Sequence, residues 1–311
     1  MNNNQLSIIN HDNLPLVVAG SGAKASEKFI EFFFATIRNK NTRDAYARAV
    51  MKFLDFMATN GITELAEIRP LMVAAYIEQH PSSDQTIKQH LSAISKMFDY
   101  LAMNQIIEAN PAASVKGPRY SYSRGKTPVL TPEQTKYLIE SIDISKPLGL
   151  RDRALIGAMV YSFARISAVV AMDTDDYFAE GKRWMFRLHE KGGKEHYVPV
   201  HHKEIEYIDE YIEAWDIEIG SREPLWLTRN GNRLQRTEVW YMIKRRVKAA
   251  GLPESACNHT FRATGITTFL ENDGKLEKAQ QIAAHASTKT TKLYDRRDDD
   301  LTQDEIERIR I

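Results

Sequence analysis

The first third of the chain repeats apolar side chains at the spacing of helices. Thr42 is placed to cap a helix that ends at Gly61, because threonine often precedes a helix and glycine often follows one. The polar residues 82–85 have the pattern of a capping box and predict the start of another helix. With shorter helices before and between these two, we expect four helices within residues 26–104. Apolar positions on one face of the two longer helices are Tyr46, Ala49, Val50, Phe53, Leu54, Met57, Ile87, Leu91, Ile94, Phe98 and Leu101.

The rest of the chain adds one pair of strands to further helices. Residues 131–134, Thr-Pro-Glu-Gln, are typical of a helix start, and residues 150–172 predict a helical stretch that breaks near Ala164. The β-rich segments 184–189 and 195–200 flank a Lys-Gly-Gly-Lys turn and predict a β-hairpin. Because Pro199 lacks an amide hydrogen, its strand is expected at a sheet edge. Further helices are predicted at about 203–216, 236–250, 259–271, 275–284 and 287–294.

These elements predict a mainly α fold with a small β-hairpin. A four-helix N-terminal domain would be followed by a mixed α/β, mostly helical domain, and 311 residues are enough for two cores. A Gly-, Pro- and Ser-containing basic stretch marks the boundary. We expect a tail at 1–24, a helical domain at 25–114, a linker at 115–130, a second domain at 131–300 and a terminal segment at 301–311.

Composition excludes several classes of protein. The single cysteine, Cys257, rules out an internal disulfide, and no Cys/His cluster has zinc-finger spacing. The N-terminus lacks the pattern of a signal peptide, and no run of about 18 apolar residues occurs. We therefore expect a cytoplasmic protein without a structural metal or membrane contact.

Charge is balanced overall but uneven locally. With 42 Lys and Arg against 41 Asp and Glu, no global field attracts a polyanion. Cations gather in the linker and in residues 244–248, where they could contact DNA phosphates, although a solvated helix face is the simpler interpretation of any one of them. Lys88 is a further candidate on a helix face that could enter a DNA groove. The candidate DNA-binding residues are Lys88, Lys116, Arg119, Arg124, Lys126, Lys244, Arg245, Arg246 and Lys248.

One ordered set of polar residues carries most of the chemical information. His259 and Arg262 lie three residues apart and share a helical face, and Tyr294 follows His285 by nine residues. Upstream, an arginine follows the predicted helix break and a lysine stands at the hairpin tip. In this order Arg165, Lys191, His259, Arg262, His285 and Tyr294 resemble the active site of tyrosine recombinases, the phage-integrase and Xer-like family.

The resemblance extends to fold and assembly. It covers residues of about 130–300, and the helices within 26–104 are similar to the family's SAM-like core-binding domain. It implies a site-specific recombinase acting on double-stranded DNA, a homotetramer in the synaptic complex and a monomer or weak dimer when free. The terminal segment, with Ile306, Ile309 and Ile311, would pack on a neighbouring protomer or on its own core.

The resemblance also implies a role for each residue. Tyr294 would attack the scissile phosphorus and form a 3′-phosphotyrosyl intermediate without metal, ATP or another cofactor. Arg165 and Arg262 would hold the phosphate with planar guanidinium groups. The lysine would protonate the departing 5′-oxygen; Lys191 fits by position, and Lys194 is the alternative, because a three-residue shift across the tip exchanges them.

His259 would exchange a proton with the tyrosine hydroxyl or hold the phosphate, and His285 would hydrogen-bond to the phosphate. Three positions depart from the family pattern. Glycine is usual where Phe163 and Ala284 stand, and glutamate is common where Ala168 stands. We therefore expect the support of the first arginine to differ in this chain.

Three other functions are compatible with parts of the pattern. A type IB topoisomerase-like enzyme would use the same tyrosine chemistry without synapsis, and a catalytically idle DNA-binding protein could share the scaffold. A metal-dependent nuclease would need paired carboxylates, for which Asp173, Asp175 and Asp176 are candidates. A charged loop is the simpler interpretation of these three residues.

Overall fold

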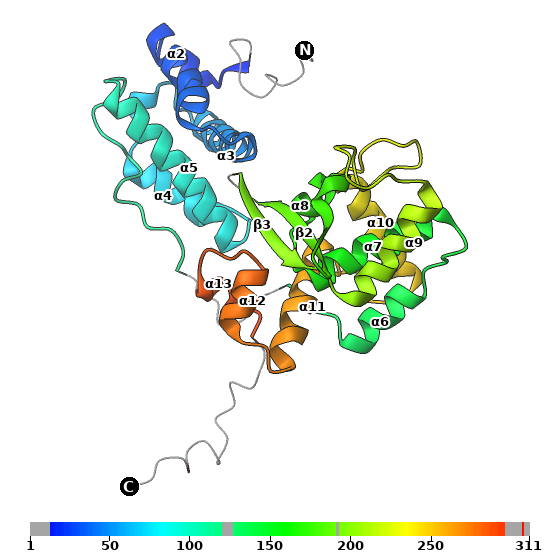
Figure 1. Cartoon of the computed structure of the whole chain (residues 1–311). Coiled ribbons are helices and arrows are strands. Elements are labelled where there is room, and N and C mark those ends of the chain that lie inside the picture. Colours follow the sequence, from blue (N-terminus) through cyan, green and yellow to red (C-terminus); the bar gives the residue numbers. More distant parts are fainter. Residues whose placement is uncertain (1–12, 120–126, 191–192, 296–306, 308–311) are drawn as a thin grey trace. The chain divides into compact units, whose positions relative to one another are not determined.

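The computed structural model describes residues 13–119, 127–190, 193–295 and 307. The chain divides into two compact units, Met1–Ser121 and Tyr122–Ile311, and the division falls within the predicted linker at 115–130 (Figure 1). Each unit has its own hydrophobic core. The mainly α fold with a small sheet is as predicted.

The first unit is helical throughout its regular structure. Phe53, Leu54 and Met57 of one long helix and Ile94 and Phe98 of the other are almost completely buried, so the predicted apolar faces meet in one core. In the described part of this unit the elements are α1 (Leu16–Gly20), α2 (Ala23–Glu31), the π-helix η2 (Phe32–Thr36), α3 (Lys40–Thr59), the 3₁₀ turn η3 (Leu65–Glu67), α4 (Pro70–Gln79) and α5 (Asp84–Met103).

Two details of this unit differ from the predictions. Helix α3 starts earlier than predicted, because the side chain of Asn39 caps it by accepting a hydrogen bond from the Thr42 amide at 3.1 Å. The prediction of a tail over residues 1–24 is wrong where the structure describes it. Val17 and Val18 of α1 are fully buried in the core, since burying this short apolar run stabilises an otherwise marginal helix.

In the second unit, helices lie beside a three-stranded antiparallel sheet (Figure 1). Strand β2 lies between β1 and β3, so Pro199 stands on an edge strand as predicted. Thr131 and Gln134 form the predicted capping box. The described elements are α6 (Pro132–Glu140), α7 (Pro147–Tyr161), α8 (Ile166–Ala171), η4 (Thr174–Asp176), β1 (Tyr177–Glu180), β2 (Arg183–Glu190), β3 (Lys194–Pro199), α9 (His202–Trp215), α10 (Arg236–Ala249), α11 (Asn258–Glu271), α12 (Leu276–Ile282) and α13 (Thr288–Lys292).

Close packing of α11 on α7 positions the polar residues of both. At Gly265 of α11 a Cβ atom would lie only 2.1 Å from the carbonyl oxygen of Val160, so a larger residue would push the helices apart. Next to this contact the chain breaks between α7 and α8, near the predicted Ala164. The break and the middle of α11 therefore lie side by side.

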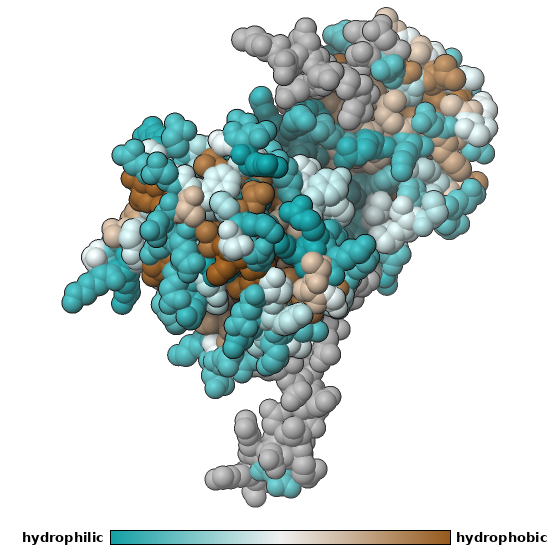
Figure 2. All heavy atoms as spheres, turned by 90° about the vertical axis from the view of Figure 1, so that its right-hand side faces the viewer, coloured by the Kyte–Doolittle hydropathy of each residue, from teal (hydrophilic) through white to brown (hydrophobic). Residues whose placement is uncertain are grey.

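The face of the molecule drawn in Figure 2 is mostly polar. Hydrophilic side chains cover most of the face in Figure 2, with smaller apolar areas between them. Large apolar side chains that are well exposed include Leu71, Met103 and Tyr241. Within the described residues, none of the helices combines the length and apolar character that crossing a membrane requires.

Candidate active site

Arg165 stands at the turn between α7 and α8. Phe163, two residues earlier, has a left-handed backbone with φ of 54°, and the Ser162 hydroxyl accepts a hydrogen bond from the Ala164 amide at 3.2 Å. This turn ends α7 and places Arg165 as the N-cap of α8. Its guanidinium Nη1 donates to Glu190 Oε2 at 2.5 Å. The Arg165 side chain is 36% exposed, so a ligand can reach it.

Arg262 lies in the first turns of α11 and is almost completely buried. It donates hydrogen bonds from Nη1 to the carbonyl of Phe163 and from Nη2 to the carbonyl of Ala283, the latter at 2.6 Å. Burial and the nearby charge of Arg165 lower the pKa of Arg262 to about 10. The guanidinium therefore stays positive at neutral pH and adds charge to the site.

His259 precedes Arg262 by about one helical turn on α11 and is exposed at its surface. Its pKa is below the usual value, because the surrounding protein removes part of its water and because Arg262 and Arg165 repel its protonated form. The neutral imidazole is therefore favoured at pH 7. A neutral ring can accept a proton from a hydroxyl group.

His285 and Tyr294 face each other near the end of the described part of the second unit. Their rings stack with centroids 5.9 Å apart and an interplanar angle of 11°. The tyrosine is held at its backbone, where the carbonyl accepts a hydrogen bond from the Thr267 hydroxyl of α11 at 3.0 Å. Its hydroxyl also interacts with the Arg262 guanidinium.

The histidine of this pair is buried. Its Nδ1 lies 2.9 Å from the hydroxyl of Thr291, which is itself fully buried. Burial, with repulsion from Arg262 and Arg165, lowers the pKa of His285 to about 4. A neutral ring is thus expected throughout the physiological pH range.

The structure brings together five of the six predicted catalytic residues. They come from the α7–α8 turn, from α11 and from the two segments that flank α13, and they interact electrostatically with one another. Lys191 lies outside the described residues. Lys194 is exposed on β3, and its backbone lies opposite that of Glu190 in the pairing of β2 with β3. The residues assembled are Arg165, His259, Arg262, His285 and Tyr294.

Glu190 is a member of this site that the sequence did not reveal. Its side chain is 8% exposed, and it is the last residue of β2. Sequence inspection identified the basic residues of the tip and gave no reason to connect a strand-end glutamate with an arginine 25 residues earlier. The charge of Glu190, adjacent to Lys191, was the one available signal.

The predicted DNA-binding residues have different surroundings. Arg246 forms an internal ion pair and is less available to DNA, because its Nε and Nη2 atoms lie 3.0 and 2.7 Å from buried Asp152. The Arg245 side chain is 64% exposed. Lys244 lies over the Trp240 ring at 5.6 Å and donates to the Glu254 carbonyl. Lys88, Lys116, Arg119 and Lys248 are exposed.

Arg124 and Lys126 of the same set lie outside the described residues. All nine assignments to DNA therefore stay predictions.

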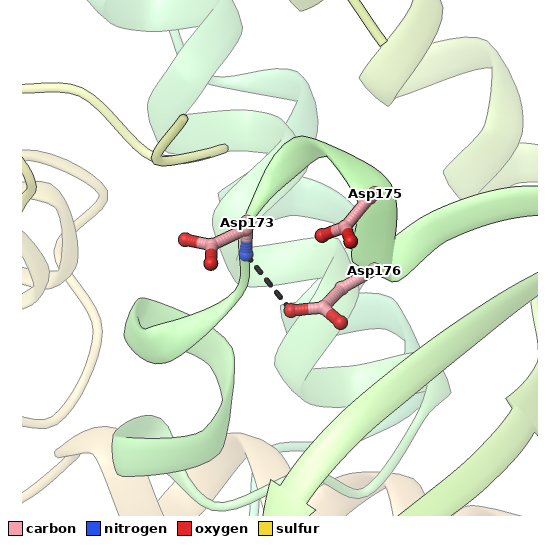
Figure 3. Close-up of side chains that lie close together, drawn as sticks. All are labelled: Asp173, Asp175 and Asp176. Carbon is pink, nitrogen blue, oxygen red and sulfur yellow. Dashed lines mark hydrogen bonds between the residues drawn. The ribbon is translucent and has the colours of Figure 1, made fainter. Parts of the chain in front are cut away.

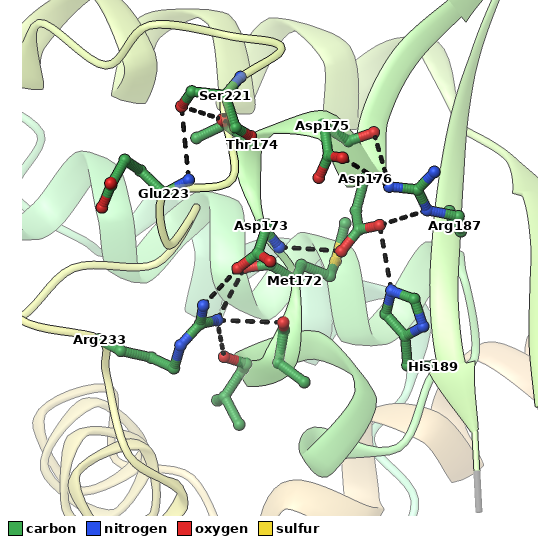
Figure 4. Close-up of polar contacts among 12 residues, drawn as sticks. Met172, Asp173, Thr174, Asp175, Asp176, Arg187, His189, Ser221, Glu223 and Arg233 are labelled. Carbon is green, nitrogen blue, oxygen red and sulfur yellow. Dashed lines mark hydrogen bonds and ion pairs between the residues drawn. The ribbon is translucent and has the colours of Figure 1, made fainter. Parts of the chain in front are cut away.

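The three aspartates that could suggest a metal site are paired with cations. One oxygen from each lies within 4.8 Å of the others, around η4 (Figure 3). Arg187 contacts Asp176 at 2.6 Å and Asp175 at 2.9 Å, and Arg233 contacts Asp173 (Figure 4). These ion pairs tie η4 to β2 and to the segment before α10. The cluster has a sufficient structural role without a metal ion.

Both units match models of known protein families. Residues 128–300 match the family model of the phage integrase family, and residues 27–105 match the model described as the phage integrase N-terminal SAM-like domain. The chain is 30% identical over 225 residues to tyrosine recombinase XerC of Chlamydia pneumoniae, covering 72% of this chain and 71% of that protein. Tyrosine recombinase XerD of Staphylococcus epidermidis is 26% identical over 263 residues, covering 82% and 88%.

Solved structures share the fold. XerH site-specific recombinase bound to its difH substrate, in a pre-cleavage complex, superposes with a TM-score of 0.70 at 20% identity, covering 92% of this chain and 84% of that one. A lambda integrase dimer bound to a core site gives 0.67 at 18% identity, covering 88% and 95%. The matched catalytic unit contains the clustered arginines, histidines and tyrosine described above, and this chain belongs to the phage integrase family of tyrosine recombinases.

Proposed function

We propose that this protein is a site-specific DNA recombinase that cleaves and rejoins DNA with Tyr294 as the nucleophile. The observation that carries the assignment is the position of Tyr294, whose ring stacks on His285 and whose hydroxyl interacts with Arg262. A tyrosine oxygen beside a charged guanidinium is placed to attack a phosphate that the guanidinium binds. This reaction uses neither a metal ion nor ATP.

In the cleavage step, Tyr294 Oη attacks the scissile phosphorus and the bond from phosphorus to the 5′-oxygen breaks. The tyrosine stays attached to the 3′-phosphate, and the 5′-oxygen leaves as a hydroxyl after taking a proton. Arg165 and Arg262 stabilise the negative charge that develops on the non-bridging oxygens. Attack of a 5′-hydroxyl from another strand reverses these steps and releases the tyrosine, so the bond energy is conserved.

Neutral histidines suit the proton transfers of this mechanism. His259, with its lowered pKa, accepts the proton of the Tyr294 hydroxyl, and the cleavage rate should fall as acid protonates the ring. If the Thr291 hydroxyl donates to Nδ1 of His285, the proton of that ring is on Nε2 and can be donated to a phosphate oxygen. The hairpin lysine, Lys191 or its alternative Lys194, supplies the proton for the leaving 5′-oxygen.

The first unit supplies a DNA-binding face in this proposal. The exposed side of α5 carries Lys88, and on the same helix Ser92 contacts the Tyr46 hydroxyl of α3 at 3.3 Å. Lys96 lies over the ring of Tyr46 at 5.6 Å. Cations and hydrogen-bonding groups on two neighbouring helices form a surface suited to a DNA groove and its phosphates.

Further phosphate contacts are proposed for the linker and α10. Arg245 and Lys248 are the exposed members of the α10 cluster, whereas Arg246 is held by Asp152. Substituting an exposed cation should weaken binding to all sequences and reduce its salt dependence.

Recombination requires four protomers around two duplexes, and we place this reaction in the cytoplasm. The second unit has an apolar groove of about 740 Å³ between α6, α7 and α11, lined by Ile139, Val160 and Phe269. We assign this groove to the terminal segment 301–311 of a neighbouring copy, whose isoleucines would match its apolar lining.

The experiment uses DNA from the regions that flank the gene, nicked so that the cleaved fragment diffuses away. Wild type and Tyr294→Phe are incubated with this DNA in EDTA and resolved on a denaturing gel. A covalent adduct formed by wild type and by Tyr241→Phe, the exposed control on α10, but lost in Tyr294→Phe, is the expected result. Specific binding without an adduct would instead favour an idle DNA-binding protein.

Relaxation of plasmid that lacks the specific site would favour the topoisomerase-like alternative. Exchange between two labelled duplexes, each carrying the mapped site, distinguishes a recombinase from that enzyme. We expect recombinant strands with wild type and none with Tyr294→Phe.

A further inference from the structure

Arg165 and Glu190 form an ion pair in the candidate site. Nη1 of the arginine lies 2.5 Å from Oε2 of the glutamate, and the glutamate side chain is 8% exposed. A charge-assisted hydrogen bond with a partly buried partner restricts the rotamers of both side chains more than an exposed ion pair does. Among the described residues of the hairpin, Glu190 is the one whose side chain holds Arg165 in place.

The carboxylate of Glu190 balances part of the positive charge of the site. Burial is the main cause of the lowered pKa of Arg262, and the nearby positive charge of Arg165 lowers it further. The position three residues after Arg165, where a carboxylate would be at hand on the same helix, is occupied by buried Ala168. Glu190 offsets the repulsion from another element of the fold.

The geometry leaves the arginine able to bind a phosphate. The contact with Glu190 uses Nη1, and a guanidinium has further N–H groups on Nη2 and Nε. The side chain of Arg165 is 36% exposed. One edge of the guanidinium can thus donate to Glu190 while its other N–H groups donate to the scissile phosphate.

Glu190 also connects the arginine to the hairpin on which the two candidate lysines lie in sequence. It is the last residue of β2, pairs with Lys194 of β3 and immediately precedes Lys191. A displacement of this strand end would therefore be transmitted to Arg165 through the ion pair with Glu190.

We infer that Glu190 is a positioning residue for DNA cleavage, which orients Arg165 toward the scissile phosphate and links that orientation to the hairpin carrying the catalytic lysine. This inference rests on the proposed function. Glu190 itself does not touch the reacting atoms, so its loss should slow the cleavage step and leave DNA affinity nearly unchanged.

The test measures single-turnover adduct formation on the nicked DNA, together with affinity in a gel shift. Glu190→Gln, which keeps the size of the side chain and removes its charge, should lower the cleavage rate by about tenfold, less than the 10²–10³ expected for losing a direct donor. Its dissociation constant for DNA should stay within about twofold. Glu190→Asp keeps the charge and should recover part of the rate.

The matched control is Glu195→Gln. Glu195 lies on β3 of the same hairpin and contacts the Tyr197 hydroxyl at 2.7 Å, so this change removes a carboxylate from the hairpin without touching Arg165. It should cleave like wild type. An equal loss in Glu195→Gln, or a loss confined to DNA affinity in Glu190→Gln, would overturn the inference.

A double variant tests whether Glu190 acts through Arg165. If it does, adding Glu190→Gln to Arg165→Lys should cause little further loss, whereas independent roles would give losses that multiply. Losses that multiply would contradict the inference, and so would a wild-type cleavage rate in Glu190→Gln. In either case the adduct formed by wild type would still support the recombinase. Absence of the adduct in wild type itself would count against the proposed function instead.

Discussion

Arg262 donates a hydrogen bond from Nη2 to the carbonyl oxygen of Ala283 at 2.6 Å. The same guanidinium donates from Nη1 to the carbonyl of Phe163, 99 residues away in sequence. These carbonyls belong to the turns that precede Arg165 and His285. Arg262 thus holds two other phosphate-binding candidates in place, in addition to any contact of its own with DNA.

Replacing Arg262 should therefore affect folding as well as cleavage. Arg262→Lys cannot reach both carbonyls with a planar fork, and it leaves a buried acceptor without a donor. We expect a loss of about 1–3 kcal/mol in the free energy of unfolding, measured with urea. Arg165→Lys serves as the comparison, since the Arg165 side chain is 36% exposed. Equal stability of the two variants would show that Arg262 has no such structural role.

Ala284 stores backbone strain beside His285. Its φ of 47° lies in the left-handed region, which costs a residue with a Cβ roughly 1 kcal/mol. Ala284→Gly should relieve this strain and raise the free energy of unfolding by up to about 1 kcal/mol, partly offset by the flexibility of glycine in the unfolded chain. The neighbour Ala283 has φ of −78°, so Ala283→Gly should lower stability. A loss in both variants would contradict the argument.

The order of polar residues along the chain allowed most of the site to be predicted. The order and spacing of Arg165, His259, Arg262, His285 and Tyr294 resemble the family's active site, and the structure brings these five together. The family's usual glycines, replaced here by Phe163 and Ala284, fall on positions with positive φ, which gives that pattern a physical cause.

The features that the sequence did not predict depend on contacts between distant segments. Strand β1 is only four residues long and is stabilised by its pairing with β2, where Tyr177 stacks on Trp184 at 4.3 Å. Helix α1 forms because Val17 and Val18 enter the core of the first unit. The role of Glu190 arises from a contact that no local pattern contains. Periodicity describes one element at a time and cannot specify such pairings.

Asp152 is the centre of a buried charge cluster in the second unit. Its carboxylate is fully buried; Oδ1 accepts two hydrogen bonds from Arg151, and Oδ2 accepts two from Arg246. Asp152→Asn keeps the shape of the side chain but leaves two guanidinium groups without a counter-charge. We expect a loss of about 3–5 kcal/mol in the free energy of unfolding, measured with urea.

The exposed pair Lys136 and Glu140 of α6 provides the control for Asp152. The two side chains are 74% and 63% exposed, and their atoms lie 3.8 Å apart. Glu140→Gln should change stability by about 0.5 kcal/mol or less. If Asp152→Asn were no more damaging than Glu140→Gln, the cluster would be dispensable, and Arg246 would become a stronger candidate for DNA contact.

Glu204 of α9 is a fully buried carboxyl group, and neither of its oxygens has a hydrogen-bond partner among the described residues. Burial raises its pKa well above 4.5, and the charge of Arg153 opposes this effect only in part. The folded protein therefore keeps a proton that the unfolded chain releases above about pH 4.5. The stabilising contribution of this proton is complete below that pH and is lost as the pH rises toward the raised value.

Glu204→Gln keeps the neutral form at every pH. Its free energy of unfolding, relative to wild type, should therefore increase as the pH rises above about 4.5, because wild type loses stability as the pH approaches the raised pKa and the variant does not. Urea titrations of both proteins at several pH values measure this difference. The exposed Glu206→Gln, on the same helix, should show no such rise, since Glu206 is paired with Lys203 at 2.8 Å and its pKa is lowered. A difference between Glu204→Gln and wild type that stays constant with pH would show that Glu204 is ionised in the folded protein.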